Sequence, residues 1–293
     1  MGVAARDVHR VRVRGRKDLV ESSAAAMSVT QTGVFFTIND SGNEPVLFAL
    51  DTTGVDRGAW RVRRAKNDDW EAASIGLCGS RAARGIGSQS WCVYIGDVGD
   101  YAEVRREGVI YRVAEPAARR ERSSVDAVSA EALVYRYADG PHDVEAMYVR
   151  PDGAITLITK RPRLNRSSQL RPALVFTLPA NAWGSDTTVV AVLTDSLPIV
   201  PGSAVLRTIT DAALSPDNRY LAVRTYGQVY VFAADTATGR VIASIPPAIC
   251  NIAGVEDEPG EGVTWIGATN RLLLTSEGRN ASIQIVSCPL PRR

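Results

Sequence analysis

Five short segments of this sequence can be aligned so that one polar or acidic residue leads each of them into a small apolar run. The leading residues are Ser23, Glu71, Glu145, Asp211 and Glu261. After each run comes a turn, or in one case a longer loop, and then an apolar β-type run that ends at a polar cluster. A supersecondary unit that recurs at spacings of about 50 to 75 residues is typical of a propeller or a solenoid.

Most units continue with two more predicted strands, which are short, rich in β-branched and aromatic residues, and bounded by Gly, Asp, Asn or Pro. The third strands are expected at 46–50, 109–113, 174–178, 229–232 and 282–286. The fourth strands are expected at 59–62, 133–137, 189–193 and 240–245. Each of these units would therefore form one four-stranded blade.

The fifth unit has no fourth strand of its own, and the N-terminus offers one. Residues 9–14 alternate polar and apolar side chains and precede the first unit. Pairing with the last unit would close the ring and cover the strand edge that the last blade otherwise exposes. The sequence therefore predicts an all-β fold, a five-bladed β-propeller whose last blade is closed by an N-terminal strand, with residues 1–293 as a single domain.

Composition narrows the class of partner. The chain of 293 residues carries a net charge of +2, which gives no reason to expect a nucleic acid polymer or an anionic membrane surface. No apolar stretch approaches the length needed to span a bilayer. We expect a monomer whose partner is an anionic small-molecule ligand or substrate.

The four cysteines favour an oxidising compartment. Cys78 follows one predicted strand and Cys92 lies in the next, so a disulfide between them closes a loop easily. Cys250 and Cys288 are both assigned to the last unit and could pair by elimination. An even cysteine count in a loop-rich β protein is typical of a secreted or extracytoplasmic protein. The first residues contain no apolar h-region, so we expect the signal peptide to be absent from this chain.

Blade geometry places the function at one mouth of the central channel. The first strand of each blade runs along the channel and the second runs back antiparallel to it. The start of the first strand and the end of the second therefore lie at the same mouth, where the five leading residues converge. Polar clusters surround them there, at 39–42, 96–100, 160–161, 224–225 and 276–278.

Carboxylates that converge on one axis repel one another, so some must be protonated or a cation must lie among them. Ca²⁺ takes many oxygen ligands in tolerant geometry, whereas zinc favours His or Cys. We therefore predict a Ca²⁺ cofactor whose ligands are Ser23, Glu71, Glu145, Asp211 and Glu261. The alternative is that the acids cap the strands, hydrogen-bond to neighbouring blades and hold channel water.

The polar clusters supply the candidate catalytic residues, which are Asp40, Asp97, Lys160, Arg224 and Glu277. Asp40 and Asp97, like nearby Asp100, lie in turn-forming sequences that turn chemistry alone could explain. Arg224 ends an apolar strand near the channel, where a charged residue usually has a partner.

Lys160 begins a basic loop with Arg161, Arg163, Arg166 and Arg171. This loop is either a solvated charged loop or an anion clamp, because Arg offers bidentate contacts to phosphate and carboxylate groups. The sequence contains only two histidines, and His142 is expected to be a loop residue rather than a catalytic one.

As a set, several motifs resemble those of a family of secreted actinobacterial β-propeller proteins. The motifs are Asn-Asp-Ser-Gly-Asn (39–43), Asp-Trp-Glu (69–71), Gly-Asp-Val-Gly-Asp (96–100), Asp-Val-Glu-Ala (143–146), Ile-Thr-Lys (158–160) and Gly-Glu-Gly (260–262). The resemblance covers most of the chain and implies a propeller, but it implies little about activity.

The chain is also, more weakly, similar to the calcium-activated nucleotidases (apyrases), five-bladed propellers whose central Ca²⁺ is held by Ser and Glu residues of the innermost strands. On that pattern Ser23, Glu71, Glu145 and Glu261 match in type, whereas Asp211 stands where the pattern has Ser. The similarity implies that Lys160, Arg161 and Arg224 would hold a nucleotide.

These observations lead to one main functional hypothesis and two alternatives. The main hypothesis is a metal-dependent hydrolase of an anionic small molecule such as a phosphate ester or nucleotide. Lys160 and Arg224 would neutralise charge, and Asp40 or Asp97 would orient the attacking water. The first alternative is a non-catalytic ligand- or protein-binding propeller with a structural calcium. The second is a glycoside hydrolase that uses channel carboxylates drawn from Asp97, Glu145 and Glu277.

Overall fold

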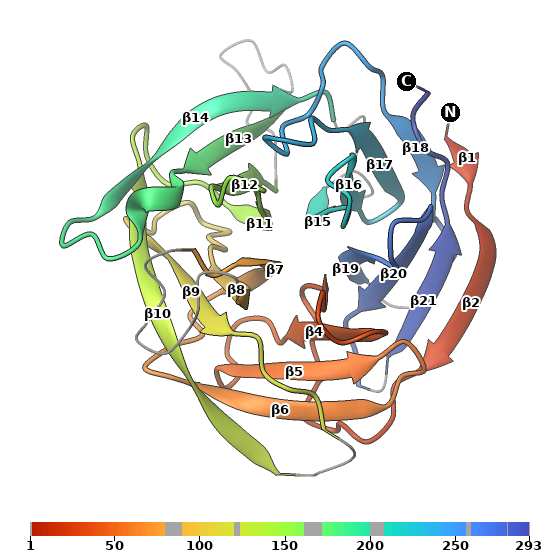
Figure 1. Cartoon of the computed structure of the whole chain (residues 1–293), viewed down its shortest axis with the longest axis horizontal. Coiled ribbons are helices and arrows are strands. Elements are labelled where there is room, and N and C mark those ends of the chain that lie inside the picture. Colours follow the sequence, from red (N-terminus) through yellow and green to blue (C-terminus); the bar gives the residue numbers. More distant parts are fainter. Residues whose placement is uncertain are drawn as a thin grey trace.

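The strands lie around a central axis in the computed structural model, which describes residues 2–79, 90–119, 124–160, 172–199, 208–255, 259–279 and 281–292 (Figure 1). Within these residues, antiparallel pairing groups the strands into five sets of four, and each set is one blade. The predicted all-β fold of the propeller type is confirmed.

Blade 1 consists of β3 (Ala26–Met27), β4 (Val34–Ile38), β5 (Val46–Asp51) and β6 (Asp56–Arg63). Blade 2 consists of β7 (Trp70–Leu77), β8 (Trp91–Asp97), β9 (Gly108–Ala114) and β10 (Val125–Tyr137). Blade 3 consists of β11 (Val144–Val149), β12 (Ile155–Thr159), β13 (Ala173–Leu178) and β14 (Val189–Leu197), with the 3-10 helix η1 (Ala180–Ala182) between the last two.

Blade 4 consists of β15 (Ile209–Leu214), β16 (Tyr220–Thr225), β17 (Gln228–Ala233) and β18 (Ala248–Asn251). Blade 5 consists of β19 (Gly260–Trp265), β20 (Arg271–Ser276), β21 (Ser282–Ser287) and the N-terminal β2 (Arg6–Arg12). The inner strands contact one another in the cyclic order β3, β7, β11, β15, β19, and β19 contacts β3.

The predicted closure of the last blade by the N-terminus is confirmed, with shifted bounds. β2 pairs antiparallel with β21, and it covers Arg6–Arg12 rather than 9–14. The shift arises because Arg14 has already left blade 5: its N–H donates to the Gly54 carbonyl at 2.7 Å in the β5–β6 turn. The preceding β1 (Val3–Ala4), which the sequence did not predict, pairs in parallel with β18. The N-terminal segment therefore contacts blades 4, 5 and 1 in turn.

The predicted fourth strand of blade 4 at 240–245 is wrong, because that strand is β18 at Ala248–Asn251. A turn at 235–240 explains the difference. The Asp235 carboxylate accepts hydrogen bonds from the N–H and hydroxyl of Thr238, and Gly239 adopts a positive φ of 65°. The apolar residues that follow are not a strand, and Val241 packs against the buried core between blades 3 and 4.

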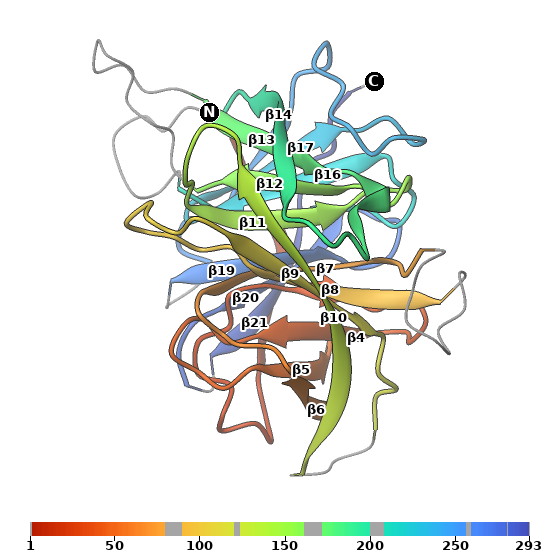
Figure 2. The same ribbon diagram turned by 90° about the vertical axis from the view of Figure 1, so that its left-hand side faces the viewer.

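β10 is longer than predicted and links three blades. Its C-terminal part pairs antiparallel with β9, as expected for blade 2. Its N-terminal part pairs in parallel with β6 of blade 1, and its last residues pair in parallel with β14 of blade 3. Figure 2 shows β10 (yellow-green) running from the level of β11 and β12 to that of β6. Blades 1 to 3 thus share one twelve-stranded sheet.

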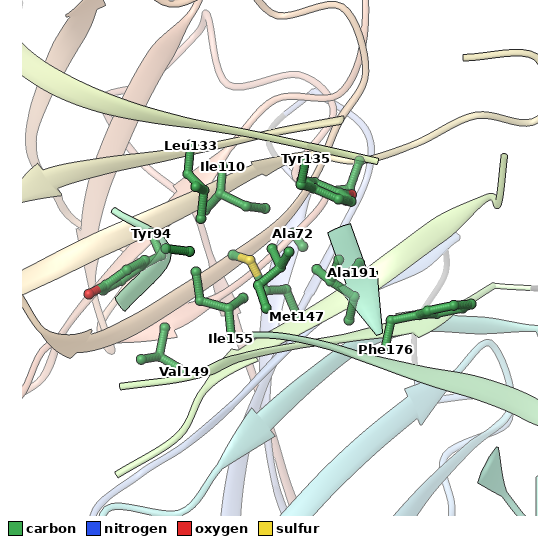
Figure 3. Packing of buried hydrophobic residues seen from close by; sticks show 14 of the residues in the cluster. Ala72, Tyr94, Ile110, Leu133, Tyr135, Met147, Val149, Ile155, Phe176 and Ala191 are labelled. Atoms are coloured by element: carbon green, nitrogen blue, oxygen red, sulfur yellow. The ribbon is translucent and has the colours of Figure 1, made fainter. Parts of the chain in front are cut away.

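The hydrophobic core lies between successive blades rather than at the channel. In the cluster between blades 2 and 3, Ala72 and Ile110 face Met147 and Ile155, and all four are nearly or completely buried (Figure 3). This packing fixes the spacing of the inner strands, and so it also fixes the spacing of the side chains that they carry to the mouth.

Both disulfides are present. Cys78–Cys92 links β8 to the residue after β7 within blade 2, as predicted. Cys250–Cys288 is also formed, but Cys250 belongs to β18 of blade 4 and Cys288 follows β21 of blade 5, so this bond joins two blades. None of the described segments forms a helix long and apolar enough to cross a membrane.

Candidate cation and acid–base site at one mouth of the channel

The register of each blade brings the start of the inner strand beside the end of the second strand. Trp70 pairs with Asp97 in blade 2, and Val144 pairs with Thr159 in blade 3. Charged side chains at these ends interact electrostatically across different blades, so the ends meet at one mouth of the channel. We call the group formed by Asp40, Asp69, Glu71, Glu145, Lys160, Tyr226, Glu261 and Glu277 the acidic mouth.

Irregular pairing at the start of the inner strands presents the acids to the mouth. Glu71 and Glu145 are the residues at which the registers of β7–β8 and β11–β12 shift, so neither pairs in its ladder. In β15 the shift falls at Thr210, so that Asp211 itself pairs with Arg224, and in β19 it covers Glu261 and Gly262. A bulge bends the strand and changes the direction of the neighbouring side chains. The repeated acid therefore coincides with a repeated backbone irregularity, which the sequence pattern did not reveal.

Three carboxylates come closest together. Oxygen atoms of Asp40, Asp69 and Glu71 all lie within 4.8 Å of one another. Burial raises the pKa of Asp69 to about 6, with a further contribution from Asp40. Burial and the negative charge of Glu145 raise the pKa of Glu71 well above its usual value.

A glycine makes room for this carboxylate group. A Cβ atom at Gly99 would lie 2.5 Å from Oδ2 of Asp69 and 2.8 Å from Cγ of Glu71, so only glycine fits without displacing them. Gly99 belongs to the Gly-Asp-Val-Gly-Asp motif, whose composition is typical of a turn and which also supplied the candidate catalytic residue Asp97. Close packing against two carboxylates is a second reason for glycine at this position.

Among the eight residues that make up the acidic mouth, Lys160 is the one that carries a positive charge. Its ammonium group forms an ion pair with Glu145, with 16% of the Lys160 side chain and 3% of the Glu145 side chain exposed. Burial raises the pKa of Glu145, and Lys160 opposes that rise. Burial also disfavours the charged ammonium, but Glu145 and Glu71 outweigh it and raise the pKa of Lys160.

Blade 5 contributes a second pair of carboxyl groups. Burial raises the pKa of Glu261 to about 8, although Lys160 opposes the rise. Glu277 and the Tyr226 hydroxyl are hydrogen-bonding neighbours of the Glu261 carboxyl group. Burial and the charge of Asp40 raise the pKa of Glu277. With its pKa near 8, Glu261 is mostly protonated at neutral pH.

Asp211 is fully buried and bonds to backbone groups of three blades. Its Oδ2 accepts N–H hydrogen bonds from Ala25 at 3.2 Å and Val263 at 2.7 Å, and its Oδ1 accepts one from Ala212 at 2.8 Å. Burial raises the pKa of Asp211, and the three N–H groups oppose the rise. These contacts correspond to the alternative in which an acid hydrogen-bonds to neighbouring blades.

Arg224, also predicted as a site residue, is completely buried. Its guanidinium donates to the carbonyls of Gly262 at 2.6 Å and Thr275 at 2.7 Å, which lie in β19 and β20. The expected partner of this charged residue is therefore the backbone of blade 5. Arg224 supports the two strands that carry Glu261 and lead to Glu277.

Asp97 is buried beneath the turn that precedes β7. It accepts the backbone N–H of Asp69 at 3.0 Å and forms an ion pair with Arg105 at 2.8 Å. Burial raises the pKa of Asp97, and Arg105 opposes the rise. Asp97 therefore holds the backbone of Asp69 in place.

Ser23 is buried, and its hydroxyl donates to the Glu21 carbonyl at 3.4 Å. His142 packs edge-on against Tyr137 and contacts the Asp139 carboxylate at 2.9 Å through Nε2. Arg161, Arg163, Arg166 and Arg171 of the predicted basic loop lie outside the described residues.

Sequence reasoning did not single out Asp69, Tyr226 or Arg105. Asp69 stands two residues before Glu71 in the Asp-Trp-Glu motif, so its position near a candidate ligand was a usable signal. Tyr226 follows the strand that ends near Arg224, and Arg105 lies in a loop with no recognisable pattern. Only the folded chain brings Tyr226 to Glu261 and Arg105 to Asp97.

Comparison with solved structures supports the fold. The chain is similar to the major Malassezia sympodialis allergen Mala s 1, with a TM-score of 0.55, 9% identity, and coverage of 97% of this chain and 96% of that one. It is less similar to the Pan2 WD40 domain of Neurospora crassa, with a TM-score of 0.44, 11% identity, and coverage of 98% and 97%. The PQQ domain of pyranose dehydrogenase from Coprinopsis cinerea gives a TM-score of 0.46, 9% identity, and coverage of 97% and 96%.

At 9% identity, the likeness to Mala s 1 shows the fold alone. No protein-family model matches the chain, and no curated protein matches it. The propeller part of the resemblance noted from the sequence is confirmed, whereas its narrower parts, to the actinobacterial proteins and the nucleotidases, stay predictions.

Proposed function

We propose that this protein is a propeller that binds a divalent cation of the calcium type at the acidic mouth and uses that site to hydrolyse an anionic small molecule, such as a phosphate ester. The observation that carries the proposal is the approach of Asp40, Asp69 and Glu71 to within 4.8 Å of one another. Hard cations such as Ca²⁺ bind several carboxylate oxygens from different chain segments. The donor set therefore fits such an ion.

The charge balance of the mouth supports the same proposal. Six carboxyl groups and one ammonium group belong to the acidic mouth, counting only its described members. Their mutual repulsion contributes to the raised pKa values of Asp69, Glu71 and Glu277. A divalent cation would offset this repulsion, and an anionic substrate could then approach a mouth that otherwise repels it.

The neighbouring side chains have properties suited to acid–base chemistry. A bound divalent cation would polarise the substrate oxygen and acidify a water molecule. Glu261, protonated near neutral pH, could donate a proton to the leaving group. Lys160, whose side chain is partly exposed, could contact the anion. Asp40 and Glu277 are the candidate bases, while Asp97 and Arg224 position the groups around them.

One observation favours a second candidate, a ligand-binding propeller with a structural cation. Lys160 is already paired with Glu145, and Arg224 is bonded to two carbonyls. Both residues that were predicted to hold a phosphate are therefore engaged in other contacts. The glycosidase alternative gains no such support. Of its candidate carboxylates, Glu145 forms an ion pair with Lys160 and Asp97 forms one with Arg105.

The two disulfides support an extracytoplasmic location, because such bonds persist in oxidising compartments. We therefore propose that the protein is secreted or extracytoplasmic. Transport to the medium of the source cell can be followed by immunoblotting of cell and medium fractions.

Calcium titration by calorimetry tests the cation site. We expect the wild type to bind one Ca²⁺ and the Asp69→Asn and Glu71→Gln variants to bind at least tenfold more weakly, roughly the 1.4 kcal/mol that one tenfold step represents. Asp186→Asn is the matched control, because Asp186 is exposed and distant in sequence from the mouth. Equal binding by all four proteins would overturn the proposed site.

A substrate panel separates the hydrolase from the binding module. Nucleotides, aryl phosphates and aryl glycosides are assayed with Ca²⁺ and with EDTA. The hydrolase proposal expects phosphate-ester turnover that requires Ca²⁺ and falls in Glu261→Gln and Lys160→Ala. If Ca²⁺ binds with the expected stoichiometry and no compound turns over, the binding module replaces the hydrolase.

A further inference from the structure

Asn67 lies in the segment that connects β6 of blade 1 to β7 of blade 2, and its side chain contacts both blades beside the proposed cation site. Its Nδ2 donates to the carbonyls of Asp40 at 2.7 Å and Asn39 at 3.1 Å, where the chain leaves β4. Its Oδ1 accepts the Trp70 N–H at 3.0 Å, at the start of β7. One side chain therefore joins the backbone of Asp40 to the strand that carries the blade 2 carboxylates.

These contacts require a carboxamide in one orientation. The two carbonyls of blade 1 need a donor, and the Trp70 N–H needs an acceptor. Rotation of the amide by 180° would place its oxygen against two carbonyl oxygens. An aspartate would have no donor for the carbonyls, and a serine side chain is too short to reach them. The bridge between the blades therefore depends on asparagine at position 67.

The blade 2 side of the site is fixed without Asn67. The Asp69 carbonyl accepts the N–H groups of Val98 at 3.1 Å and Gly99 at 3.2 Å, and all three residues belong to blade 2 or the segment before it. Asp40 comes from blade 1. Pairing of β6 with β10 joins the same two blades at their outer strands, whereas Asn67 joins them at the mouth. The distance between the Asp40 and Asp69 carboxylates therefore depends on this side chain.

A cation site is sensitive to that distance. Oxygen ligands lie about 2.3 to 2.6 Å from Ca²⁺ and about 2.0 to 2.1 Å from Mg²⁺. A displacement of Asp40 by about 1 Å would thus take its oxygen out of coordination distance.

We infer that Asn67 is a positioning residue of the cation site, whose carboxamide holds Asp40 at coordinating distance from the two carboxylates of blade 2. The inference rests on the proposed function in that the bound group is a divalent cation. The separation of the carboxylates that Asn67 sets is also a property of the metal-free protein, so it can be measured independently of that function.

Calcium titration of Asn67→Ser by calorimetry tests the inference. A serine hydroxyl can still accept the Trp70 N–H three residues later, but it cannot reach the Asp40 carbonyl. We expect Asn67→Ser to bind Ca²⁺ about tenfold more weakly than the wild type. Asn43→Ser is the matched control, because Asn43 donates to the same Asp40 carbonyl at 3.1 Å from within blade 1. Its Ca²⁺ affinity should stay within about twofold of the wild type.

A second background shows whether Asn67 acts through Asp40. In Asp40→Asn the ligand that Asn67 positions is already impaired, so adding Asn67→Ser should weaken Ca²⁺ binding by less than about twofold more. A general loss of folded structure would instead weaken binding by the same factor in both backgrounds.

The outcomes separate the inference from the proposed function. Equal Ca²⁺ affinity of Asn67→Ser and the wild type, or the same loss in both backgrounds, would overturn the inference and leave the proposed cation function standing. If the wild type itself binds no Ca²⁺, the proposed function fails, and crystal structures of the metal-free wild type and Asn67→Ser decide the inference. A wider separation of the Asp40 and Asp69 carboxylate oxygens in the variant supports it, and an unchanged separation contradicts it.

A further variant guards against misfolding. Asn67→Thr carries the same side-chain oxygen and replaces Asn67→Ser if the serine variant does not fold. Failure of both variants to fold would contradict a role confined to positioning.

Discussion

Blades 1 to 3 and blades 4 and 5 hold their neighbours together by different means. In the first group, β10 pairs with β6 on one side and β14 on the other, so backbone hydrogen bonds run continuously across three blades. In the second group, blades 4 and 5 form separate sheets that are linked by the Cys250–Cys288 disulfide and by the N-terminal β1 and β2. Blades 1 to 3 are therefore joined by strand pairing, and blades 4 and 5 are joined by a disulfide and the N-terminal segment.

The two halves also contribute different chemistry to the acidic mouth. Asp40, Asp69 and Glu71, the proposed cation ligands, come from blades 1 and 2. Glu261, whose pKa is raised to about 8, and its hydrogen-bonding neighbour Glu277 come from blade 5. Lys160 and Glu145 of blade 3 lie between them. We therefore expect the geometry of the cation site to depend on the strand pairing that joins blades 1 to 3. The geometry of Glu261 and Glu277 should depend on the disulfide and the N-terminal segment that link blades 4 and 5.

Removal of the inter-blade disulfide should have the largest effect. In the chain-entropy account, a bond that spans 38 residues stabilises the fold by about 4 kcal/mol, and one that spans 14 residues by about 3 kcal/mol. We expect Cys250→Ala/Cys288→Ala to lower the free energy of unfolding by about that larger amount and Cys78→Ala/Cys92→Ala by the smaller one. Urea unfolding measures both. An equal or reversed order would contradict the idea that blades 4 and 5 depend more on their covalent link.

Asp211→Asn should have the next largest effect, because Asp211 joins blades 4, 5 and 1 through three backbone N–H groups. An asparagine presents one carbonyl oxygen where the carboxylate presents two, so at least one buried N–H loses its acceptor. The expected cost is about 2 to 3 kcal/mol in urea unfolding. Asp186→Asn is again the control, and a cost for Asp211→Asn no larger than that control would show that these contacts are dispensable.

Glu261 should make stability depend on pH. Its pKa is raised from 4.5 to about 8 in the folded chain, so the folded state holds this proton more strongly than the unfolded state. The associated stability is fully present below about pH 4.5 and is lost as pH rises through 8, with a slope of at most about 1.4 kcal/mol per pH unit. Glu261→Gln should flatten this dependence. Urea unfolding midpoints, recorded in EDTA between pH 5 and 9, measure this dependence of stability on pH. If the wild type and Glu261→Gln show the same slope, the prediction is wrong.

Asp69, which precedes β7 of blade 2, should make calcium binding depend on pH. Its pKa is raised to about 6, and a cation binds the ionised carboxylate. Calcium affinity should therefore fall by up to about tenfold per pH unit below 6, and change little from this group above pH 7. Calorimetric titrations at pH 5, 6, 7 and 8 measure the effect. Gly99→Ala, whose Cβ would crowd Asp69, should weaken binding at every pH without removing this dependence.

Much of the fold follows from local patterns. The repeated apolar runs located most strands, because alternation and bounding turn residues act within a few residues of chain. The error at 240–245 has a local cause as well, since those apolar residues pack against the core after a turn instead of pairing. The extension of β10 was not predictable, because its pairing with β6 and β14 depends on segments far away in the chain.

The candidate site divides in the same way. The sequence by itself determined which residue types stand at the start of each inner strand and at the end of each second strand, because that placement follows from the repeat. The tertiary structure alone decided how those groups are used: Asp211 and Arg224 bond to backbone groups, Lys160 pairs with Glu145, and Asp69 joins Asp40 and Glu71. The physical reason is that charge, burial and hydrogen bonding depend on distances between blades, which the order of residues along one blade does not contain.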